Sequence, residues 1–160
     1  MTYGDSPRLY LLEYYRINNE YEGRIDIVRI REKLTDFLNS YGYTNPKINE
    51  VFGASAWRRF AAYIDEAQEA IDMRYARAYV EHKEIMDKRL KCLCEYGYLL
   101  DRSLCAAYRE SVFQKATQLF NICLKYIVTG DAELQKRMIT LVREINATEQ
   151  RLLEKVVVLL

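Results

Sequence analysis

The positions of glycine and proline constrain this chain more than any other feature. Its 160 residues include two prolines, Pro7 and Pro46, and six glycines, and all of them lie between segments that have helical periodicity. Proline breaks the interior of a helix and glycine weakens it. Both prolines also follow good helix-capping residues, Ser6 and Asn45, which places them in the first turn of a helix. The sequence therefore predicts an all-α protein.

Apolar periodicity between these boundaries predicts where the helices lie. We expect helices over residues 6–21, 26–41, 47–52, 55–96, 101–128 and 131–160. An unbroken helix over residues 55–96 would be roughly 60 Å long, so a bend near residues 72–75 is the alternative. Short turns oblige neighbouring long helices to fold back on each other. We expect an antiparallel bundle of three long helices over residues 55–160, with a smaller N-terminal helical subdomain over residues 1–54.

The charge distribution does not favour a protein that depends on long-range attraction to nucleic acid. The net charge is +1, and acidic and basic residues are spread evenly, whereas proteins steered to phosphate usually carry a basic domain or stripe. No apolar run reaches the roughly 18 residues that a membrane span requires. The N-terminus also lacks the pattern of a signal peptide. We expect an intracellular protein without a membrane span, in the cytoplasm or, if the chain is viral, in the virion.

No arrangement of residues indicates catalysis or a bound cofactor. Cys92 and Cys94 lack the second ligand pair of a structural zinc site, and on a helix they would point apart. We expect buried free thiols at these positions and at Cys105 and Cys123. His82, the only histidine, has the helical phase of a core or seam residue and no nucleophile motif beside it. We therefore expect a protein that is not an enzyme and that binds neither a metal nor a cofactor.

Residues 48–60 have the outline of a helix-turn-helix reader of DNA. A short helix leads to a turn at Gly53, and Ser55 is placed to cap a second helix. Arg58 and Arg59 lie early in that helix, where a recognition helix contacts bases and phosphates.

The motif departs from the usual pattern in two ways: Asn49 stands where a small residue normally lets the helices cross closely, and the apolar residue that should lock the second helix, Phe60, comes one position late. The alternative is a loop with a single helical turn.

Further along, arginines alternate with tyrosines, and a second basic group follows. Arginine and tyrosine together can stack bases or grip phosphate, and they also dominate the energetic centres of protein interfaces. Glu84 and Asp87 lie four residues before Lys88 and Lys91, so we expect intrahelical ion pairs to neutralise part of the second basic group. The candidate nucleic-acid contacts are Arg58, Arg59, Arg74, Arg77, Lys88 and Arg89. Tyr75 and Tyr79 are candidate partner contacts.

The last helix indicates self-association. The preceding helix can fill a seam that repeats at spacings of four and three residues and comprises Leu134, Met138, Leu141, Ile145, Thr148 and Leu152. Leu153, Val157 and Leu160 lie on an adjacent strip for which no partner within the chain is evident. Exposed apolar surface of this kind marks interaction sites. These three residues are therefore candidate partner contacts.

Together these patterns predict a non-enzymatic helical assembly, structural or interaction protein that self-associates. A viral coat or packaging subunit that contacts nucleic acid is one concrete version. The alternative is a DNA-binding helix-turn-helix protein with a helical dimerisation region. The expected partner is a second copy of the chain, and nucleic acid and another protein are further candidates.

Overall fold

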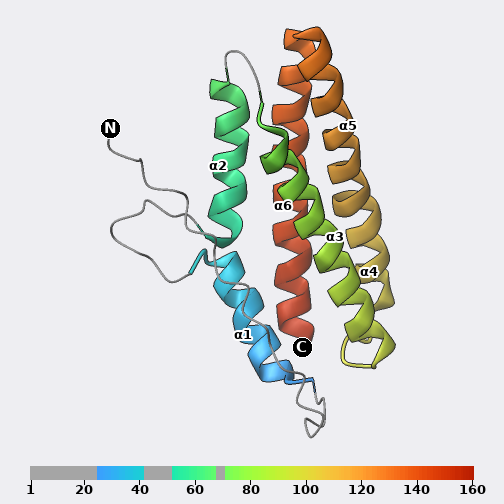
Figure 1. The fold of residues 1–160 in the computed structure, drawn as a ribbon. Helices are drawn as coiled ribbons and strands as arrows, with labels where there is room; N and C mark the ends of the chain where they lie inside the picture. Colours follow the sequence, from blue (N-terminus) through green and yellow to red (C-terminus); the bar gives the residue numbers. More distant parts are fainter. Residues whose placement is uncertain (1–24, 42–51, 68–70) are drawn as a thin grey trace, which may run out of the picture.

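The computed structural model describes residues 25–41, 52–67 and 71–160, and every element within these ranges is a helix (Figure 1). In chain order the elements are α1 (Ile27–Leu38), α2 (Gly53–Glu66), α3 (Met73–Glu95), α4 (Arg102–Tyr108), the π-helical segment η1 (Arg109–Phe113), α5 (Gln114–Thr129) and α6 (Ala132–Leu159). The predicted all-α class is confirmed. The helix predicted over residues 6–21, and all but the last residue of the one over 47–52, lie outside the described residues.

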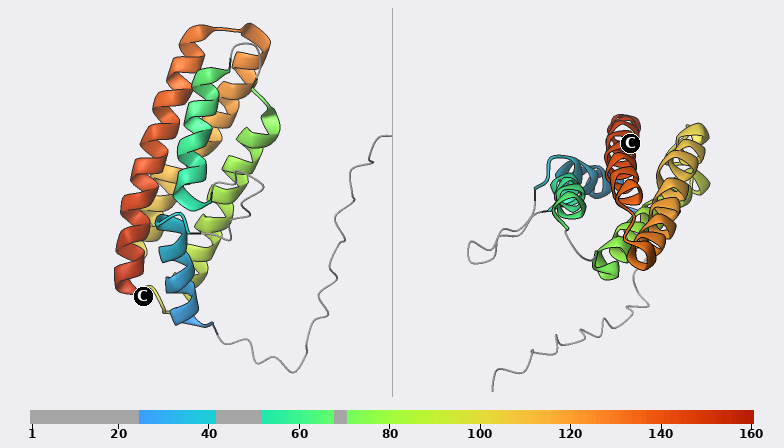
Figure 2. Two further views of the ribbon diagram at one scale, coloured as in Figure 1. Left: turned by 90° about the vertical axis from the view of Figure 1, so that its left-hand side faces the viewer. Right: turned by 90° about the horizontal axis from the view of Figure 1, so that it is seen from above.

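The C-terminal helix α6 organises the bundle. It packs against α5 and α4 on one side and against α2 and α1 on the other, as the end-on view shows (Figure 2). Helix α3 packs against the continuous rod formed by α4, η1 and α5. One apolar core, to which all of these helices contribute, lies between them. The long C-terminal helices contact each other across a tight turn, as the sequence predicted.

Aspartates and glycines set the helix boundaries. The side chains of Asp26, Asp72, Asp101 and Asp131 each accept a hydrogen bond from a backbone N–H in the first turn of the helix that follows. This pairing satisfies donors that have no partner inside the helix. Gly130 ends α5 in the left-handed conformation, with φ of 64°, which glycine adopts at little cost. The predicted break between the helices over residues 101–128 and 131–160 is confirmed.

The long helix predicted over residues 55–96 is two helices. Helix α2 ends at Glu66 and α3 begins at Met73, with Asp72 as its cap. The hydroxyl of Tyr63 accepts a hydrogen bond from the backbone N–H of Asp72 at 2.8 Å, which ties the start of α3 to α2. The chain reverses direction between the two helices (Figure 1). The predicted bend near residues 72–75 therefore marks a complete break.

The start of α2 differs from the prediction. The helix begins at Gly53 rather than after Ser55, and the backbone N–H and hydroxyl of Ser55 instead contact the hydroxyl of Ser40, at 3.0 and 2.8 Å. Gly53 has φ of 58°, and a Cβ atom at this position would collide with the backbone carbonyl of Phe37 in α1. Glycine is therefore required where the end of α1 meets the start of α2.

We expect Gly53→Ala to lower the free energy of unfolding by about 2–3 kcal/mol, because the new methyl group meets both a left-handed backbone and the Phe37 carbonyl. Gly130→Ala is the matched control, since Gly130 has φ of 64° and nothing lies within 4 Å of an added Cβ. That control should lose only about 1 kcal/mol. Urea unfolding followed by far-UV circular dichroism measures both losses. Equal losses would contradict the close contact between α1 and α2.

Candidate functional site

Exposed aliphatic side chains gather at the end of the bundle where α6 terminates. Val158 and Leu159 are 84% and 53% exposed, and Leu100, in the turn between α3 and α4, is 87% exposed. Tyr96 and Tyr98 in the same turn are also exposed. Clustered aliphatic side chains indicate an interaction site more strongly than the same residues scattered singly. A second exposed group lies near the end of α5 and comprises Leu124, Ile127 and Val128.

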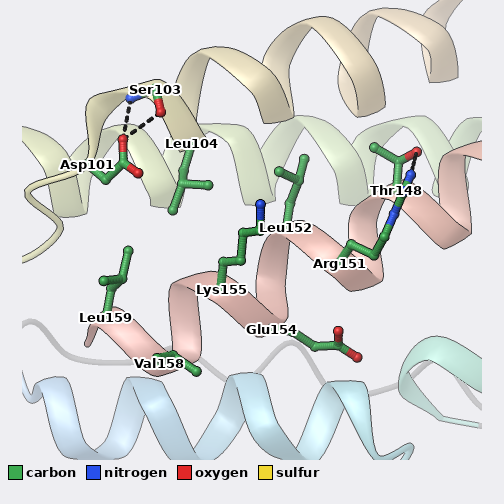
Figure 3. Close-up of a pocket in the computed structure, with 10 residues that line it drawn as sticks. All are labelled: Asp101, Ser103, Leu104, Thr148, Arg151, Leu152, Glu154, Lys155, Val158 and Leu159. Atoms are coloured by element: carbon green, nitrogen blue, oxygen red, sulfur yellow. Dashed lines mark hydrogen bonds between the residues drawn. The ribbon is translucent and has the colours of Figure 1, made fainter.

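A groove of about 660 Å³ lies beside these residues, between α4 and the last turns of α6 (Figure 3). Leu104 from α4 and Leu152 and Leu159 from α6 turn toward the space between the helices. Charged residues of both signs surround them: Asp101, Arg151, Glu154 and Lys155. The groove therefore has an apolar floor and a rim of mixed charge.

The structure places the predicted partner contacts of the last helix differently. Leu153 is fully buried in the core, and Val157 and Leu160 are half-buried against it. The guanidinium of Arg31 in α1 donates a hydrogen bond to the backbone carbonyl of Leu160. The expectation that this strip has no partner within the chain is wrong, because α1 packs against α6. The exposed apolar residues are instead Val158 and Leu159.

Most of the predicted basic contacts already have acidic or hydroxyl partners. Arg74 pairs with Asp72, Arg77 with Glu81 and Lys88 with Glu84, at 2.6–2.7 Å. The predicted Glu84–Lys88 pair is confirmed. The predicted Asp87–Lys91 pair is wrong, because Asp87 pairs with Arg109 and Lys91 with Glu95. Arg58 donates to the hydroxyl of Ser55 at 2.8 Å, while Arg59 and Arg89 are exposed.

The two tyrosines that were predicted to contact a partner differ in exposure. Tyr75 is exposed and meets the ring of Tyr63 edge-on, with ring centroids 5.2 Å apart. Tyr79 is fully buried, and its hydroxyl donates to Asn146 at 2.7 Å. Of the two, only Tyr75 is available to a partner in this conformation.

A buried ionic cluster that sequence reasoning missed lies at the centre of the bundle. The ammonium group of Lys83 and the hydroxyl of Tyr108 each donate to one carboxylate oxygen of Glu149, both at 2.5 Å. The Lys83 nitrogen also lies 4.7 Å from the ring centroid of Trp57 and 4.6 Å from that of Tyr79. Rings at this distance attract a cation. The cluster joins α3, α4 and α6, with α2 covering the lysine.

Burial controls the protonation of these groups. It lowers the pKa of Lys83, against the opposing attraction of the Glu149 carboxylate, and it raises the pKa values of Tyr79 and Tyr108 well above their ordinary value. Both hydroxyls therefore stay neutral, so that they can donate hydrogen bonds. Together, Lys83 and Tyr108 use both oxygens of Glu149, as a buried carboxylate requires.

The π-helical segment η1 follows directly after Tyr108. Arg109, its first residue, pairs with the buried carboxylate of Asp87 in α3 at 2.8 Å. A π-turn holds one extra residue, which changes the direction of the side chains on either side of it. Here it allows Tyr108 to face Glu149 while the next residue faces α3.

His82 lies under α1 and α2, between the rings of Phe37 and Trp57, with centroids at 5.2 and 5.0 Å. Burial, and secondarily the charge of Lys83, lowers its pKa to about 4. Its Nδ1 atom and the Trp57 Nε1 atom have no hydrogen-bond partner among the described residues. The predicted core position of His82 is consistent with this placement.

The cysteines differ in part from the expectation of four free thiols. The structure pairs Cys94 with Cys105 across the turn between α3 and α4, so the expectation is wrong for these two residues. Cys92 and Cys123 are free. Burial raises the pKa of Cys123 to about 11, and its sulfur lies 3.2 Å from that of Met138. Among the described residues, no three potential metal ligands gather in one place.

Comparison with protein-family models, curated proteins and solved structures found no match to this chain. Within the described part of the chain, no helix has both the length and the apolarity to cross a membrane. What the structure defines is therefore a class, an all-α helical bundle with an apolar groove at one end.

Proposed function

We propose that this protein is a non-enzymatic helical subunit that self-associates through the groove between α4 and the C-terminal end of α6. The observation that carries the proposal is the apolar floor of this groove beside the exposed Val158 and Leu159. Burying an aliphatic side chain contributes roughly 1.5–3 kcal/mol, before the cost of ordering the partners. Two such residues, each used twice in a symmetric dimer, supply a substantial driving force.

A second copy of the chain is the partner that the charges favour. The rim of the groove contains two acidic and two basic residues, Asp101, Glu154, Arg151 and Lys155. In a two-fold arrangement each surface meets itself, so a rim of mixed sign can pair with its own copy. The net charge of +1 adds little repulsion between copies.

The DNA-binding alternative has less support from the geometry. Arg74, Arg77 and Lys88 lie beside carboxylates in exposed pairs, which contribute little to stability but offset the positive charge of each cation. Duplex DNA is therefore included in the experiment that tests self-association.

We expect the double variant Val158→Glu, Leu159→Glu to reduce the solution mass to that of a single chain, while the wild type has a multiple of it. Charges placed in the groove of a symmetric dimer meet each other across the axis. Size-exclusion chromatography with light scattering measures the mass, with and without duplex DNA, and far-UV circular dichroism checks that the helices remain.

Val128→Glu is the matched control. Val128 is 85% exposed, as Val158 is, but it lies near the end of α5 at the opposite end of the bundle. A wild type with the mass of one chain would refute the proposal. So would dissociation by Val128→Glu alone, since the association would then use the other end of the molecule. Assembly that appears only with DNA would favour the alternative function.

A further inference from the structure

A second hollow, of about 380 Å³, lies between α6 and the helices α1 and α2. It shares no lining residue with the groove between α4 and α6. Phe37 and Leu38 from α1 and Trp57 from α2 form an apolar wall. Its volume falls within the range of roughly 300–1,000 Å³ that is usual for small-molecule sites.

Small residues on both sides keep this hollow open. Ala54, Ala61 and Ala62 line it from α2, and Ala147 lines it from α6. A larger side chain at any of these positions would fill the space. The hollow, which we call the slot, is therefore bordered by methyl groups and rings as well as by polar side chains.

Glu149 and Asn146, the polar residues at the floor of the slot, already have hydrogen-bond partners within the protein. Both oxygens of Glu149 already accept hydrogen bonds from the buried cluster. Asn146 uses its amide nitrogen on the Trp57 carbonyl at 3.1 Å and its oxygen on Tyr79 at 2.7 Å. Since Lys83 balances the charge of Glu149, the floor adds no net charge to the slot.

The rim of the slot, in contrast, offers cationic donors. Arg58 from α2 and Arg143 from α6 both border it and are both exposed. Arg143 lies 3.8 Å from Asp65, and the two side chains are 66% and 60% exposed. Exposed pairs of this kind contribute little, so a carboxylate of a ligand can compete for Arg143. With Asp65 the only acidic group at the rim among these lining residues, the slot favours an anion.

From these features we propose that the slot binds an amphipathic carboxylate, with its aliphatic chain between α2 and α6 and its carboxylate at Arg58 and Arg143. Guanidinium groups match a carboxylate through paired, charge-assisted hydrogen bonds. The chain would lie against Trp57 and Phe37, where it replaces water next to apolar surface. This site is independent of the proposed self-association.

The only tryptophan in the chain reports on the slot. Trp57 lines it, so its fluorescence changes when the slot is occupied. We expect sodium octanoate to change the Trp57 emission in a saturable way at pH 7. Octanol, which has the same chain without the charge, should bind roughly tenfold more weakly or worse.

Two variants test separately the contribution of the arginines to binding and the need for an open slot. Arg58→Gln, Arg143→Gln should weaken octanoate binding roughly tenfold or more. Ala147→Phe should abolish binding by filling the slot while both arginines remain. Arg59→Gln, also exposed on α2 but outside the slot, is the control and should bind octanoate as the wild type does.

The comparison of octanoate with octanol uses the wild type alone and does not depend on the folding of any variant. Equal binding of the two probes would overturn the proposal, because the arginines would then contribute nothing. No change in Trp57 emission up to saturating octanoate, or unchanged binding in the arginine double variant, would also overturn it. The solution mass of the wild type, measured without ligand, tests self-association separately.

Discussion

Glu149→Leu is expected to lower the free energy of unfolding by about 3–5 kcal/mol, because it leaves the buried ammonium group of Lys83 without its counter-charge. The hydroxyl of Tyr108 also loses its acceptor. Urea unfolding followed by far-UV circular dichroism measures this loss. Glu144→Leu is the matched control on the same helix, since Glu144 is 57% exposed and its pair with Lys115 lies at the surface. The control should lose less than about 1 kcal/mol.

Adding Lys83→Met to Glu149→Leu should recover most of the lost stability. Replacing both members of a buried ion pair with apolar residues of similar volume is often neutral or stabilising. Tyr108→Phe, added third, removes the remaining unpaired hydroxyl. If the Glu149 variant loses no more than the Glu144 control, Lys83 does not depend on Glu149 in the folded protein.

Acidification should destabilise the protein through His82. Its pKa is about 4 in the folded protein and near 6.5 in the unfolded chain. Between these values the unfolded chain binds a proton that the folded protein does not. The contribution of His82 to stability is therefore complete above pH 6.5 and is lost as the pH falls toward 4. The size of the effect is roughly 3 kcal/mol.

Because carboxylates also titrate in this pH range, the effect of His82 is measured as the difference in unfolding free energy between the wild type and a variant without the histidine. Urea unfolding of the wild type and of His82→Gln at several pH values between 4 and 7 isolates the histidine. His82 is the only histidine, so its ring proton gives a single NMR titration curve. The charged groups that act on it are Lys83, Glu149 and Arg89. A midpoint close to 6.5 would show that the ring is solvated and that the predicted loss does not occur.

The helix predicted over residues 101–128 shows which structural features the spacing of apolar residues can predict. The apolar residues that recur at steps of three and four along it are all buried, and comprise Leu104, Tyr108, Val112, Ala116, Leu119, Cys123 and Tyr126. The first three steps are four residues each, which an ordinary α-helix cannot keep on one side. The segment η1 absorbs the difference. The spacing of these residues therefore indicates a π-turn, although only an uninterrupted helix was predicted.

The candidate site was harder to predict, for two physical reasons. Glu149 has the same helical phase as Ile145 and Leu153, which are buried. The sequence pattern can therefore place this carboxylate in the core, but it does not indicate which residues pair with it. Those partners, Lys83 and Tyr108, are 66 and 41 residues away in the chain. The apolar C-terminus was noticed, but which of its residues are exposed depends on how α1 packs against α6. The contact between these two helices is a tertiary interaction, which the apolar periodicity of a single helix does not determine.

The segment η1 also sets a rule about length. One residue removed from an α-helix rotates everything after it by about 100°. The segment η1 already absorbs one residue more than a regular α-helix needs. Deleting one residue between Tyr108 and Ala116 would therefore restore a regular α-helix and still leave Leu104 and Tyr108 on the same side of the rod as Leu119. Inserting a residue there would instead rotate one half of the rod by about 100° relative to the other. The stretch consequently tolerates the loss of one residue but not the gain of one.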